Sequence, residues 1–309
     1  MTRTAVLLMG PTASGKTGHA ISLCKRFPFD VISVDSAMVY RGMDIGTAKP
    51  DAETLRRVPH RLVDIRDPED SYSAGDFVRD ARRAMDEIFA AGRVPLLVGG
   101  TMLYFRALTE GIAELPPADS AIRRDIDALA AASGWPAVHA ELAAVDPAAA
   151  ERINPNDSQR LQRALEVYRV SGRSLTDWQK QAAPQSQDIR FVKIGLRIEP
   201  RSLLHERIAG RLDLMVADGF VDEVRRLRER PGLTGDSTSM RSVGYRQFWG
   251  HLDGEIGLEE ARQRALFATR QLAKRQLTWL RSEKSLVSVN SLEAGVIDSI
   301  SITLARHLA

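Results

Sequence analysis

The stretch from Gly10 to Thr17, GPTASGKT, constrains the fold more than any other part of the chain. It fits the pattern GxxxxGK[ST], follows the apolar run from Ala5 to Met9 and precedes a helical pattern. In such a loop the glycines let the backbone approach phosphate, the lysine reaches an outer phosphate oxygen, and the hydroxyl meets Mg²⁺. The alternative is a glycine turn that merely joins a strand to a helix. We therefore expect a site for a di- or triphosphate, whose organic group the loop does not specify.

Composition places the chain among globular proteins with a proper core, since 44% of its 309 residues are hydrophobic. The apolar run near the N-terminus is too short for a secretory signal, and no run reaches membrane-spanning length. We expect a cytoplasmic protein with no membrane partner. Cys24 is the only cysteine, which excludes internal disulfides and a cysteine-based zinc site.

Apolar, strand-like segments alternate with amphipathic helical ones along the first third of the chain, at residues 4–9, 29–35, 61–65 and 94–100. This alternation predicts an α/β fold with a mostly parallel sheet flanked by helices, and ligands gathered at the carboxyl ends of the strands. Residues 119–181 show helical periodicity without a convincing strand, and residues 190–198 are strand-like again. We expect an α/β core from 1–115 and 186–309, with an all-helical insertion domain at 116–185.

A nucleotide hydrolase is disfavoured by what the α/β region lacks. It has no NKxD-like guanine reader, and no aspartate ends the 94–100 segment, where many hydrolases place a metal-ordering carboxylate. Asp64 could take that role, although an aspartate at a strand end is more often a structural cap.

Two polar residues follow predicted strands at the edge where the phosphate loop opens. Asp35 ends the 29–35 segment, where a carboxylate could act as a general base or could simply cap the next turn. Thr101 follows Gly99 and Gly100, where its hydroxyl could cap a helix or orient a nucleophile. The glycine-punctuated run 44–50 reads as a loop over the site.

The segment 262–281 carries six basic residues and no acidic one. At 100° per residue, Arg270, Lys274 and Arg281 share a narrow arc. The opposite side of the helix is apolar and consists of Ala261, Ala265, Ala268, Leu272 and Trp279. A solvated surface helix is the alternative, but the absence of partnering acids favours a polyanion, with nucleic acid the obvious candidate. Upstream, MRSVGYRQFW (240–249) mixes charge with aromatic planes, as binding to loop RNA would require.

Six blocks in order resemble the bacterial tRNA dimethylallyltransferase (tRNA isopentenyltransferase) family from Ala5 to about Arg281. They are GPTASGKT, DSAMVYRGMDIGTAKP, GGTMLYFRAL, NDSQRLQRALEVY, MRSVGYRQFW and TRQLAKRQLTWLR. The resemblance implies a P-loop kinase-like fold and Mg²⁺ as cofactor. It also implies transfer of a dimethylallyl group from dimethylallyl pyrophosphate to the exocyclic N6 amine of the adenosine 3′-adjacent to the anticodon. The substrates would be tRNAs reading codons that begin with uridine, bound through the anticodon stem-loop. Separately, we expect a monomer, because no dimer seam is evident in the sequence.

Site residues carry over from the family motifs one by one. Asp35 matches the base, Thr101 the hydroxyl beside the amine, and Arg211 a catalytic pyrophosphate ligand. The other pyrophosphate ligands would be Gly10, Thr12, Ala13, Ser14, Gly15, Lys16 and Thr17, with Thr17 also binding the metal. The matching tRNA contacts are Asp35, Ser36, Ala37, Met38, Thr101, Arg123, Gln159, Arg160, Leu161, Gln162, Arg163, Arg241, Ser242, Val243, Gly244, Tyr245, Arg246, Lys274, Arg275, Gln276, Thr278, Trp279 and Arg281.

The chain departs from the family at a few places. Met38 stands where many relatives carry glutamine, and the zinc finger of eukaryotic relatives is absent. After Ser282 the resemblance fades, and we assign that tail only to packing.

Three other functions remain open from the sequence. An adenylate isopentenyltransferase would need neither the helical insertion nor the basic helix. A small-molecule or nucleotide kinase would use the phosphate loop and Asp35 but leaves the basic helix unexplained. A non-enzymatic RNA-binding module leaves Asp35 and Thr101 without a task.

Overall fold

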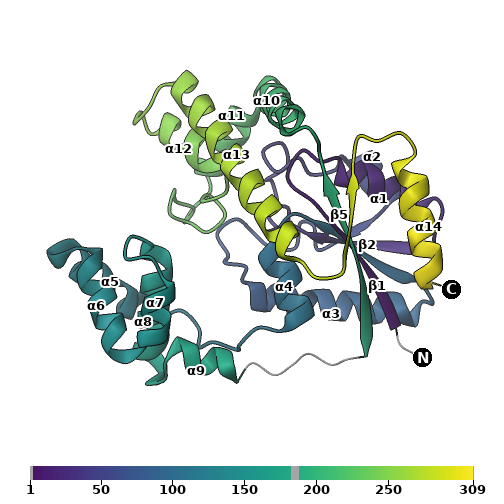
Figure 1. Ribbon diagram of the computed structural model, residues 1–309. Helices are drawn as coiled ribbons and strands as arrows, with labels where there is room; N and C mark the ends of the chain where they lie inside the picture. The colour runs from purple at the N-terminus through teal and green to yellow at the C-terminus, as the bar shows by residue number, and fades with distance from the viewer. Residues whose placement is uncertain (1–2, 182–187, 309) are drawn as a thin grey trace. The chain divides into compact units, whose positions relative to one another are not determined.

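The structure is a computed structural model that describes residues 3–181 and 188–308. Its centre is a six-stranded sheet in the order β3-β2-β4-β1-β5-β6, in which every paired strand is parallel (Figure 1). The strands are β1 (Arg3–Met9), β2 (Phe29–Val34), β3 (His60–Arg61), β4 (Val94–Gly99), β5 (Ile189–Arg197) and β6 (Leu286–Asn290). The α/β fold class expected from the sequence is confirmed.

The described helices fall into two sets. In the α/β unit they are α1 (Lys16–Cys24), α2 (Ala52–Arg57), α3 (Ala74–Ala90), α4 (Met102–Glu110), α10 (Arg201–Ala217), α11 (Phe220–Arg228), α12 (Tyr245–Leu252), α13 (Leu258–Ser282) and α14 (Val296–Leu308). Between α4 and β5 lie α5 (Ser120–Ser133), α6 (Trp135–Val145), α7 (Pro147–Arg152), α8 (Ser158–Ser171) and α9 (Leu175–Lys180). None of the helices along the described residues is both long and apolar enough to cross a membrane.

The described chain divides into two compact units, residues 3–109 with 188–308 and residues 110–181. The helical unit thus begins six residues before the predicted position 116, and the predicted boundary between 185 and 186 lies outside the described residues. The helical unit has its own core, which includes Ile126, Leu142 and Leu165.

Helices cover both faces of the sheet in the α/β unit. On one face α1 and α14 pack through Leu23 and Leu304, whereas α3 packs on the other through Phe77 and Ile88 (Figure 1). The last five residues of β1 are buried, as expected for a parallel sheet covered on both sides. Each such aliphatic side chain contributes about 2 kcal/mol to folding.

Three neighbouring strands end at one level. Gly99 of β4 is the register partner of both Met9 of β1 and Val34 of β2. The next residues continue this alignment, because the Gly10 N–H donates to the Gly99 carbonyl and the Thr101 N–H donates to the Val34 carbonyl. The three connections after these strands therefore emerge side by side at one edge of the sheet.

Two strand expectations were wrong. The predicted strand at 61–65 is a two-residue strand, His60–Arg61, because Leu62 and Asp64 have positive φ angles of 63° and 55° and the chain turns there. The residues after Ser282 were expected only to pack, but they include strand β6, which pairs with β5 at the edge of the sheet.

We predict that Gly99→Ala lowers the free energy of unfolding by about 3 kcal/mol, because an added Cβ would lie 1.9 Å from the Val34 carbonyl oxygen. Gly210→Ala in α10 is the matched control, since its Cβ would meet nothing within 4 Å. That control should be neutral or more stable by roughly 0.5 to 1 kcal/mol. Equal stability of the two variants in chemical denaturation would contradict the close approach of β4 to β2.

Candidate active site

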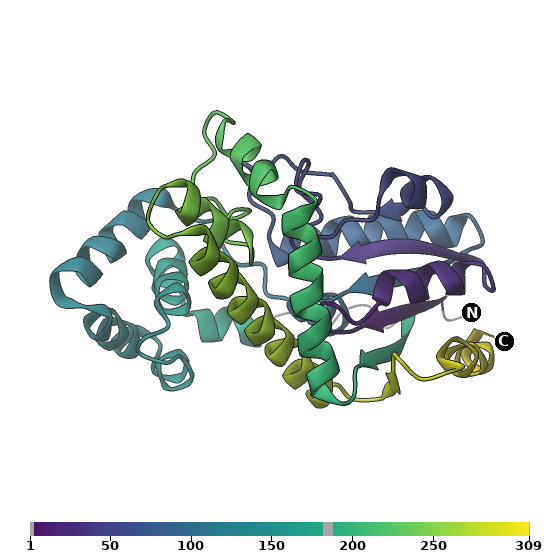
Figure 2. The ribbon, with the colours of Figure 1, turned by 90° about the horizontal axis from the view of Figure 1, so that it is seen from above.

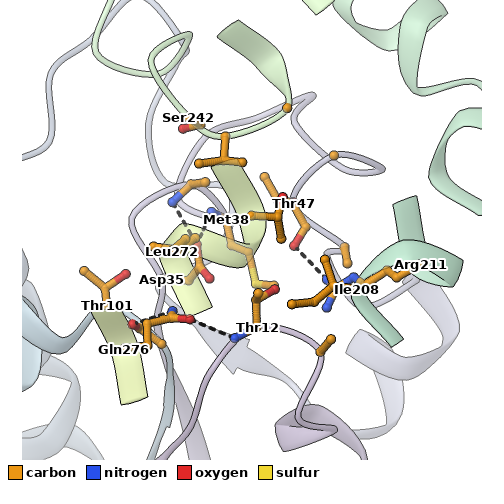
Figure 3. A pocket seen from close by; sticks show the side chains of 18 of the residues that line it. Thr12, Asp35, Met38, Thr47, Thr101, Ile208, Arg211, Ser242, Leu272 and Gln276 are labelled. Carbon is orange, nitrogen blue, oxygen red and sulfur yellow. Dashed lines mark hydrogen bonds between the residues drawn. The ribbon is translucent and has the colours of Figure 1, made fainter. Parts of the chain in front are cut away.

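A cavity of about 940 Å³ lies at the carboxyl ends of β1, β2 and β4. Its wall includes the loops that follow these strands, the loop at 46–48 and residues of α10 and α13. The helices α10 and α13 pack against each other (Figure 2). Figure 3 shows Thr101 and Gln276 on one side of the cavity and Arg211 and Ile208 on the other, with Asp35 and Thr12 between them. The strand ends thus form the floor, and two helices form walls.

The phosphate loop has the backbone that an anion site needs. Ala13 and Gly15 have φ angles of 63° and 83°, and the loop runs directly into α1. Residues 12–17 line the cavity, so the amide groups at the start of α1 are available to an anion. The Ser14 hydroxyl is buried with no hydrogen-bond partner among the described residues. The predicted ligands Thr12 to Thr17 are therefore brought together here, and Gly10 lies beneath them against Ser14.

Lys16 folds back onto its own loop. Its Nζ donates to the carbonyls of Gly10 (2.9 Å) and Pro11 (2.7 Å). Burial lowers the pKa of Lys16 to about 8, while Asp35 opposes this shift and Arg211 adds to it. The ammonium group lies in a place where an anion would stabilise its charged form.

Two arginines of α10 face the same cavity. Burial lowers the pKa of Arg211, with Asp35 opposing the shift and Arg207 adding to it. Arg207 lies one helical turn earlier, and its Nε donates to the Ala13 carbonyl (2.9 Å). The sequence motifs did not identify Arg207 as a site residue, although its i, i+4 spacing from Arg211 places both side chains on one helix face.

Asp35 is held by the loop that follows β2. Its Oδ1 accepts hydrogen bonds from the N–H groups of Ala37 (2.9 Å) and Met38 (3.2 Å). Asp35 therefore caps the turn that follows β2, which was one of the two roles left open by the sequence, but it does so through Oδ1 alone. Within the described chain Oδ2 has no hydrogen bond, and the side chain lines the cavity.

The Thr101 hydroxyl lies beside this loop. Its Oγ1 accepts from the Ser36 N–H (3.1 Å) and lies 3.4 Å from the Ser36 hydroxyl. The Thr101 carbonyl accepts from the Tyr104 N–H at the start of α4, so the backbone, rather than the hydroxyl, begins the helix. Thr101 and Asp35 are thus joined through Ser36, at the cavity edge.

The charge of the cavity is strongly asymmetric. Among the described residues that line it, the single carboxylate is Asp35, and the cationic side chains are Lys16, Arg207, Arg211, Arg241 and Arg275. Like charges at close range repel, and burial weakens the compensation from water. The free site is therefore electrostatically prepared for a multiply charged anion.

Asp64 takes no part in the lining. Its Oδ1 accepts from Lys49 Nζ (2.5 Å), which also pairs with Asp44. The observed role of Asp64 is therefore a structural ion pair rather than the strand-end cap that the sequence favoured, since β3 ends at Arg61.

Gln276 differs from its expected role as an RNA contact. Its side chain is buried, its Oε1 accepts from the Thr12 N–H (2.9 Å), and its Nε2 donates to the Gly100 carbonyl (2.8 Å). Gln276 thus connects α13 to the phosphate loop and to the residue before Thr101. The helical wheel alone could not distinguish it from its exposed neighbours.

The basic helix is less isolated from acids than its sequence indicates. Arg262 pairs with Asp213 and Glu259, and Arg264 pairs with Glu260, so acids outside the segment compensate its first turns. Further along, Lys274, Arg275, Thr278 and Arg281 are exposed.

The buried face of α13 is also rotated from the expected one. It carries Ala261, Ala265, Ala273, Gln276 and Leu280. Leu272 and Trp279, from the side predicted to be apolar, both line the cavity, and Trp279 also packs against the hydrophobic core. The exposed cations of the second half of α13 therefore lie next to a cavity wall with an aromatic ring.

The block at 241–246 borders the cavity as well. Arg241, Ser242 and Val243 line it, and Arg246 is exposed. Tyr245 was expected to contact RNA, but it is fully buried and its hydroxyl donates to Glu223 (2.6 Å). Gly244 is also buried, and both residues line the cavity, so a contact with RNA stays a prediction for that wall of the cavity alone.

The remaining expected RNA contacts lie in the helical unit. Gln159 and Arg160 are exposed at the start of α8, whereas Leu161 belongs to the core of that unit and cannot offer its side chain to a ligand. Gln162 donates to Asp127 (2.6 Å). Arg123 and Arg163 both pair with the buried carboxylate of Glu166, which places two guanidinium groups around one acid.

A residue of the segment after Ser282 forms a hydrogen bond with the phosphate loop. The Ser291 hydroxyl, which directly follows β6, donates to the Ser14 carbonyl and lies 2.7 Å from His19 Nε2. Burial lowers the pKa of His19, and Arg207 adds to this shift. The sequence carried no motif for this contact.

Two models of known protein families match this chain. A family model described as IPP transferase matches residues 38–283, and one described as isopentenyl transferase matches residues 3–70. The chain belongs to the tRNA dimethylallyltransferase family. Membership makes it an enzyme of the prenyltransferase class, as the resemblance indicated.

Relatives in this family match nearly the whole chain. A tRNA dimethylallyltransferase of Thiobacillus denitrificans is 54% identical over 304 residues, covering 98% of this chain and 97% of that protein. One of Alkalilimnicola ehrlichii is 57% identical over 283 residues, with coverage of 92% and 89%.

Solved structures agree with this fold. A tRNA isopentenylpyrophosphate transferase of Bacillus halodurans is 38% identical with a TM-score of 0.72, covering 99% of this chain and 96% of that one. A eukaryotic dimethylallyltransferase acting on tRNA, 24% identical with a TM-score of 0.78 over 98% and 78% of the two chains, supports the fold alone.

The pKa of Lys16 gives a testable pH dependence. Since the free lysine has a pKa of about 8 and an anion favours its charged form, affinity for an organic diphosphate should fall above pH 8, by up to about tenfold per pH unit. Lys16→Met should bind weakly at pH 7 and lose this decline, as measured by calorimetry from pH 7 to 10. A flat wild-type profile over that range would show that the Lys16 charge does not contribute to binding.

Proposed function

We propose that this chain transfers the dimethylallyl group of dimethylallyl pyrophosphate to the exocyclic N6 amine of the adenosine 3′-adjacent to the anticodon, releasing pyrophosphate. Its substrates are tRNAs that read codons beginning with U. One observation carries the proposal: Asp35 and Thr101 lie in the same cavity as the phosphate loop, with exposed cations at its rim. A leaving-group site and a candidate base thus share one space.

The pyrophosphate end uses the cationic half of the cavity. Lys16, Arg211 and the loop amides would bind the pyrophosphate and stabilise the negative charge that grows on it as the allylic C–O bond breaks. Arg207 lies on the same helix face as Arg211 and adds positive potential there. Apolar groups such as Ile208, Leu214 and Met215 also line the cavity and suit the hydrocarbon group.

The donor set fits Mg²⁺ as a partner of the pyrophosphate. No group of three or more His, Cys, Asp or Glu side chains along the described residues could hold a metal by itself. Mg²⁺ commonly takes one or two protein ligands together with substrate phosphates and water, and the Thr17 hydroxyl lines the cavity beside the loop. Bound there with the substrate, the ion would supply further charge neutralisation for the departing pyrophosphate.

The nucleophile needs help because the lone pair of the adenine amine is delocalised into the ring. Asp35 Oδ2 would accept the amine proton as the nitrogen attacks the allylic carbon, while Oδ1 stays bonded to the backbone. The Thr101 hydroxyl would hold the amine in line. A base stacked in the anticodon loop cannot reach these groups, so the adenosine must be flipped into the cavity.

The RNA-binding half favours tRNA over a free nucleotide. Lys274, Arg275 and Arg281 are exposed on α13, and Arg241 and Arg246 are exposed nearby in the chain. A mononucleotide would need none of these cations beyond the cavity. Arg123, Gln159 and Arg160 in the helical unit offer further polar contacts.

The proposal is tested by incubating the protein with unmodified tRNA, Mg²⁺ and radiolabelled dimethylallyl pyrophosphate, with AMP as the parallel acceptor. Nuclease mapping should place the label on the adenosine 3′ of the anticodon and none on AMP. Label on AMP would favour the nucleotide enzyme, and no label on either acceptor would reopen the kinase and binding-module readings.

Asp35→Asn should lower the rate of transfer by about 10² to 10⁴, since the amide oxygen can still accept the two backbone N–H groups but the base is lost. Affinity for tRNA should stay within a few-fold in a filter-binding assay. A large loss of tRNA affinity with a normal single-turnover rate would instead assign Asp35 to RNA anchoring.

Lys274→Ala should weaken tRNA binding and reduce the slope of log K against log salt by about one unit, because one phosphate contact is lost. Lys25→Ala is the control, since this exposed lysine directly follows α1 and is not among the residues that line the cavity. Equal slopes for wild type and Lys274→Ala would remove Lys274 from the phosphate contacts.

A further inference from the structure

The loop at 44–49 forms part of the cavity wall without any sheet or helix to hold its backbone. Gly46, Thr47 and Ala48 line the cavity. The loop closes on itself through the Ala48 N–H to the Ile45 carbonyl and the Lys49 N–H to the Asp44 carbonyl. Its remaining backbone donors need partners from elsewhere in the chain.

Glu223 of α11 supplies those partners. Its carboxylate accepts hydrogen bonds from the N–H groups of Asp44 (3.0 Å), Ile45 (2.7 Å) and Gly46 (3.1 Å), and from the Tyr245 hydroxyl (2.6 Å). The side chain is buried, with only 2% of the residue exposed. Four donors on one buried carboxylate form a strong, geometrically defined junction.

Aromatic packing closes the same junction. Phe220 and Tyr245 pack edge to face, with ring centroids 4.9 Å apart. A Cβ added to Gly46 would lie 2.1 Å from the Phe220 ring and 2.6 Å from the Tyr245 ring. The loop therefore lies directly on the two rings, and a displacement of either would move it.

The loop leads to the pyrophosphate end. Arg211 Nη2 donates to the Thr47 carbonyl (3.5 Å), and Figure 3 shows Thr47 beside Arg211, joined to it by this hydrogen bond. Thr47 itself is fixed, since its hydroxyl donates to the Met43 carbonyl (2.7 Å). At the far end Lys49 is almost fully buried and donates to the Tyr40 carbonyl (3.0 Å).

We propose that Glu223 is a positioning residue for the reaction: it fixes the 44–49 loop so that the Thr47 carbonyl orients Arg211 toward the pyrophosphate. The inference rests on the proposed function for its meaning, whereas its binding test uses inorganic pyrophosphate alone.

Glu223→Gln keeps the size of the side chain and removes half of its accepting capacity. The amide NH₂ group would replace one carboxylate oxygen and face N–H or O–H donors. The two donors that were bonded to that oxygen would lose their acceptor. We expect inorganic pyrophosphate to bind roughly tenfold more weakly, and kcat for prenyl transfer to fall with KM for tRNA unchanged. Tyr245→Phe removes one donor and should shift both in the same direction, by less.

Asp80→Asn is the matched control. Asp80 is also a buried carboxylate of the α/β unit that accepts from a tyrosine hydroxyl, Tyr72, at 3.2 Å, and it lies outside the cavity lining. It should lose stability to a similar extent in thermal unfolding, yet bind inorganic pyrophosphate normally.

A double-mutant cycle decides whether Glu223 acts through Arg211. Calorimetry with inorganic pyrophosphate is performed on wild type, E223Q, R211A and the double variant. We expect E223Q to cost roughly tenfold in the presence of Arg211 and less than twofold in its absence. An equal cost in both backgrounds, no cost, or an equal cost in Asp80→Asn would overturn the inference. Wild type that binds pyrophosphate but does not modify tRNA would overturn the proposed function instead.

Discussion

The close approach of β4 to β2 at Gly99 is the contact on which the rest of the site depends. No side chain fits there, because a Cβ would meet the Val34 carbonyl, and the strands can therefore end level with β1. The level ends place the phosphate loop, Asp35 and Thr101 on adjacent connections. A carboxyl-terminal edge of a parallel sheet is a common ligand site, but only this alignment places the phosphate loop and the Asp35 carboxylate in one cavity.

The second constraint is electrostatic. Burial lowers the pKa of both Lys16 and Arg211. A neighbouring cation lowers each pKa further, since Arg211 acts on Lys16 and Arg207 acts on Arg211. This arrangement costs folding free energy in the free protein, since buried like charges repel. In the proposed reaction a bound pyrophosphate would offset this cost, most strongly as its negative charge increases during bond cleavage. Cations that are poorly compensated in the free site are thus suited to stabilising a transition state rather than a resting fold.

Sequence patterns predicted the parts of the structure that depend on local backbone chemistry. The phosphate loop, β1, β2, β4 and β5 follow from glycine spacing and apolar runs. The segment 61–65 was misread because an apolar run does not reveal the positive φ angles of Leu62 and Asp64. Strand β6 was missed because it is short and partly exposed, without the continuous apolar run of a central strand. The role of each predicted site residue remains a prediction, whereas its place in the fold is observed.

Glu223 and Gln276 show why polar core residues are the hardest to find in a sequence. In a helix each resembles a surface residue, because the groups that satisfy it are backbone atoms distant in the chain. Irregular loops around a cavity leave N–H and carbonyl groups that neither sheet nor helix can satisfy, and an unpaired buried group costs about 1 to 3 kcal/mol. An apolar residue in place of Gln276 would leave the Thr12 N–H and the Gly100 carbonyl without these hydrogen bonds. The same hydrogen bonds that satisfy these loops fix α13 against the phosphate loop, so the helix with the exposed cations and the phosphate loop are held together by Gln276.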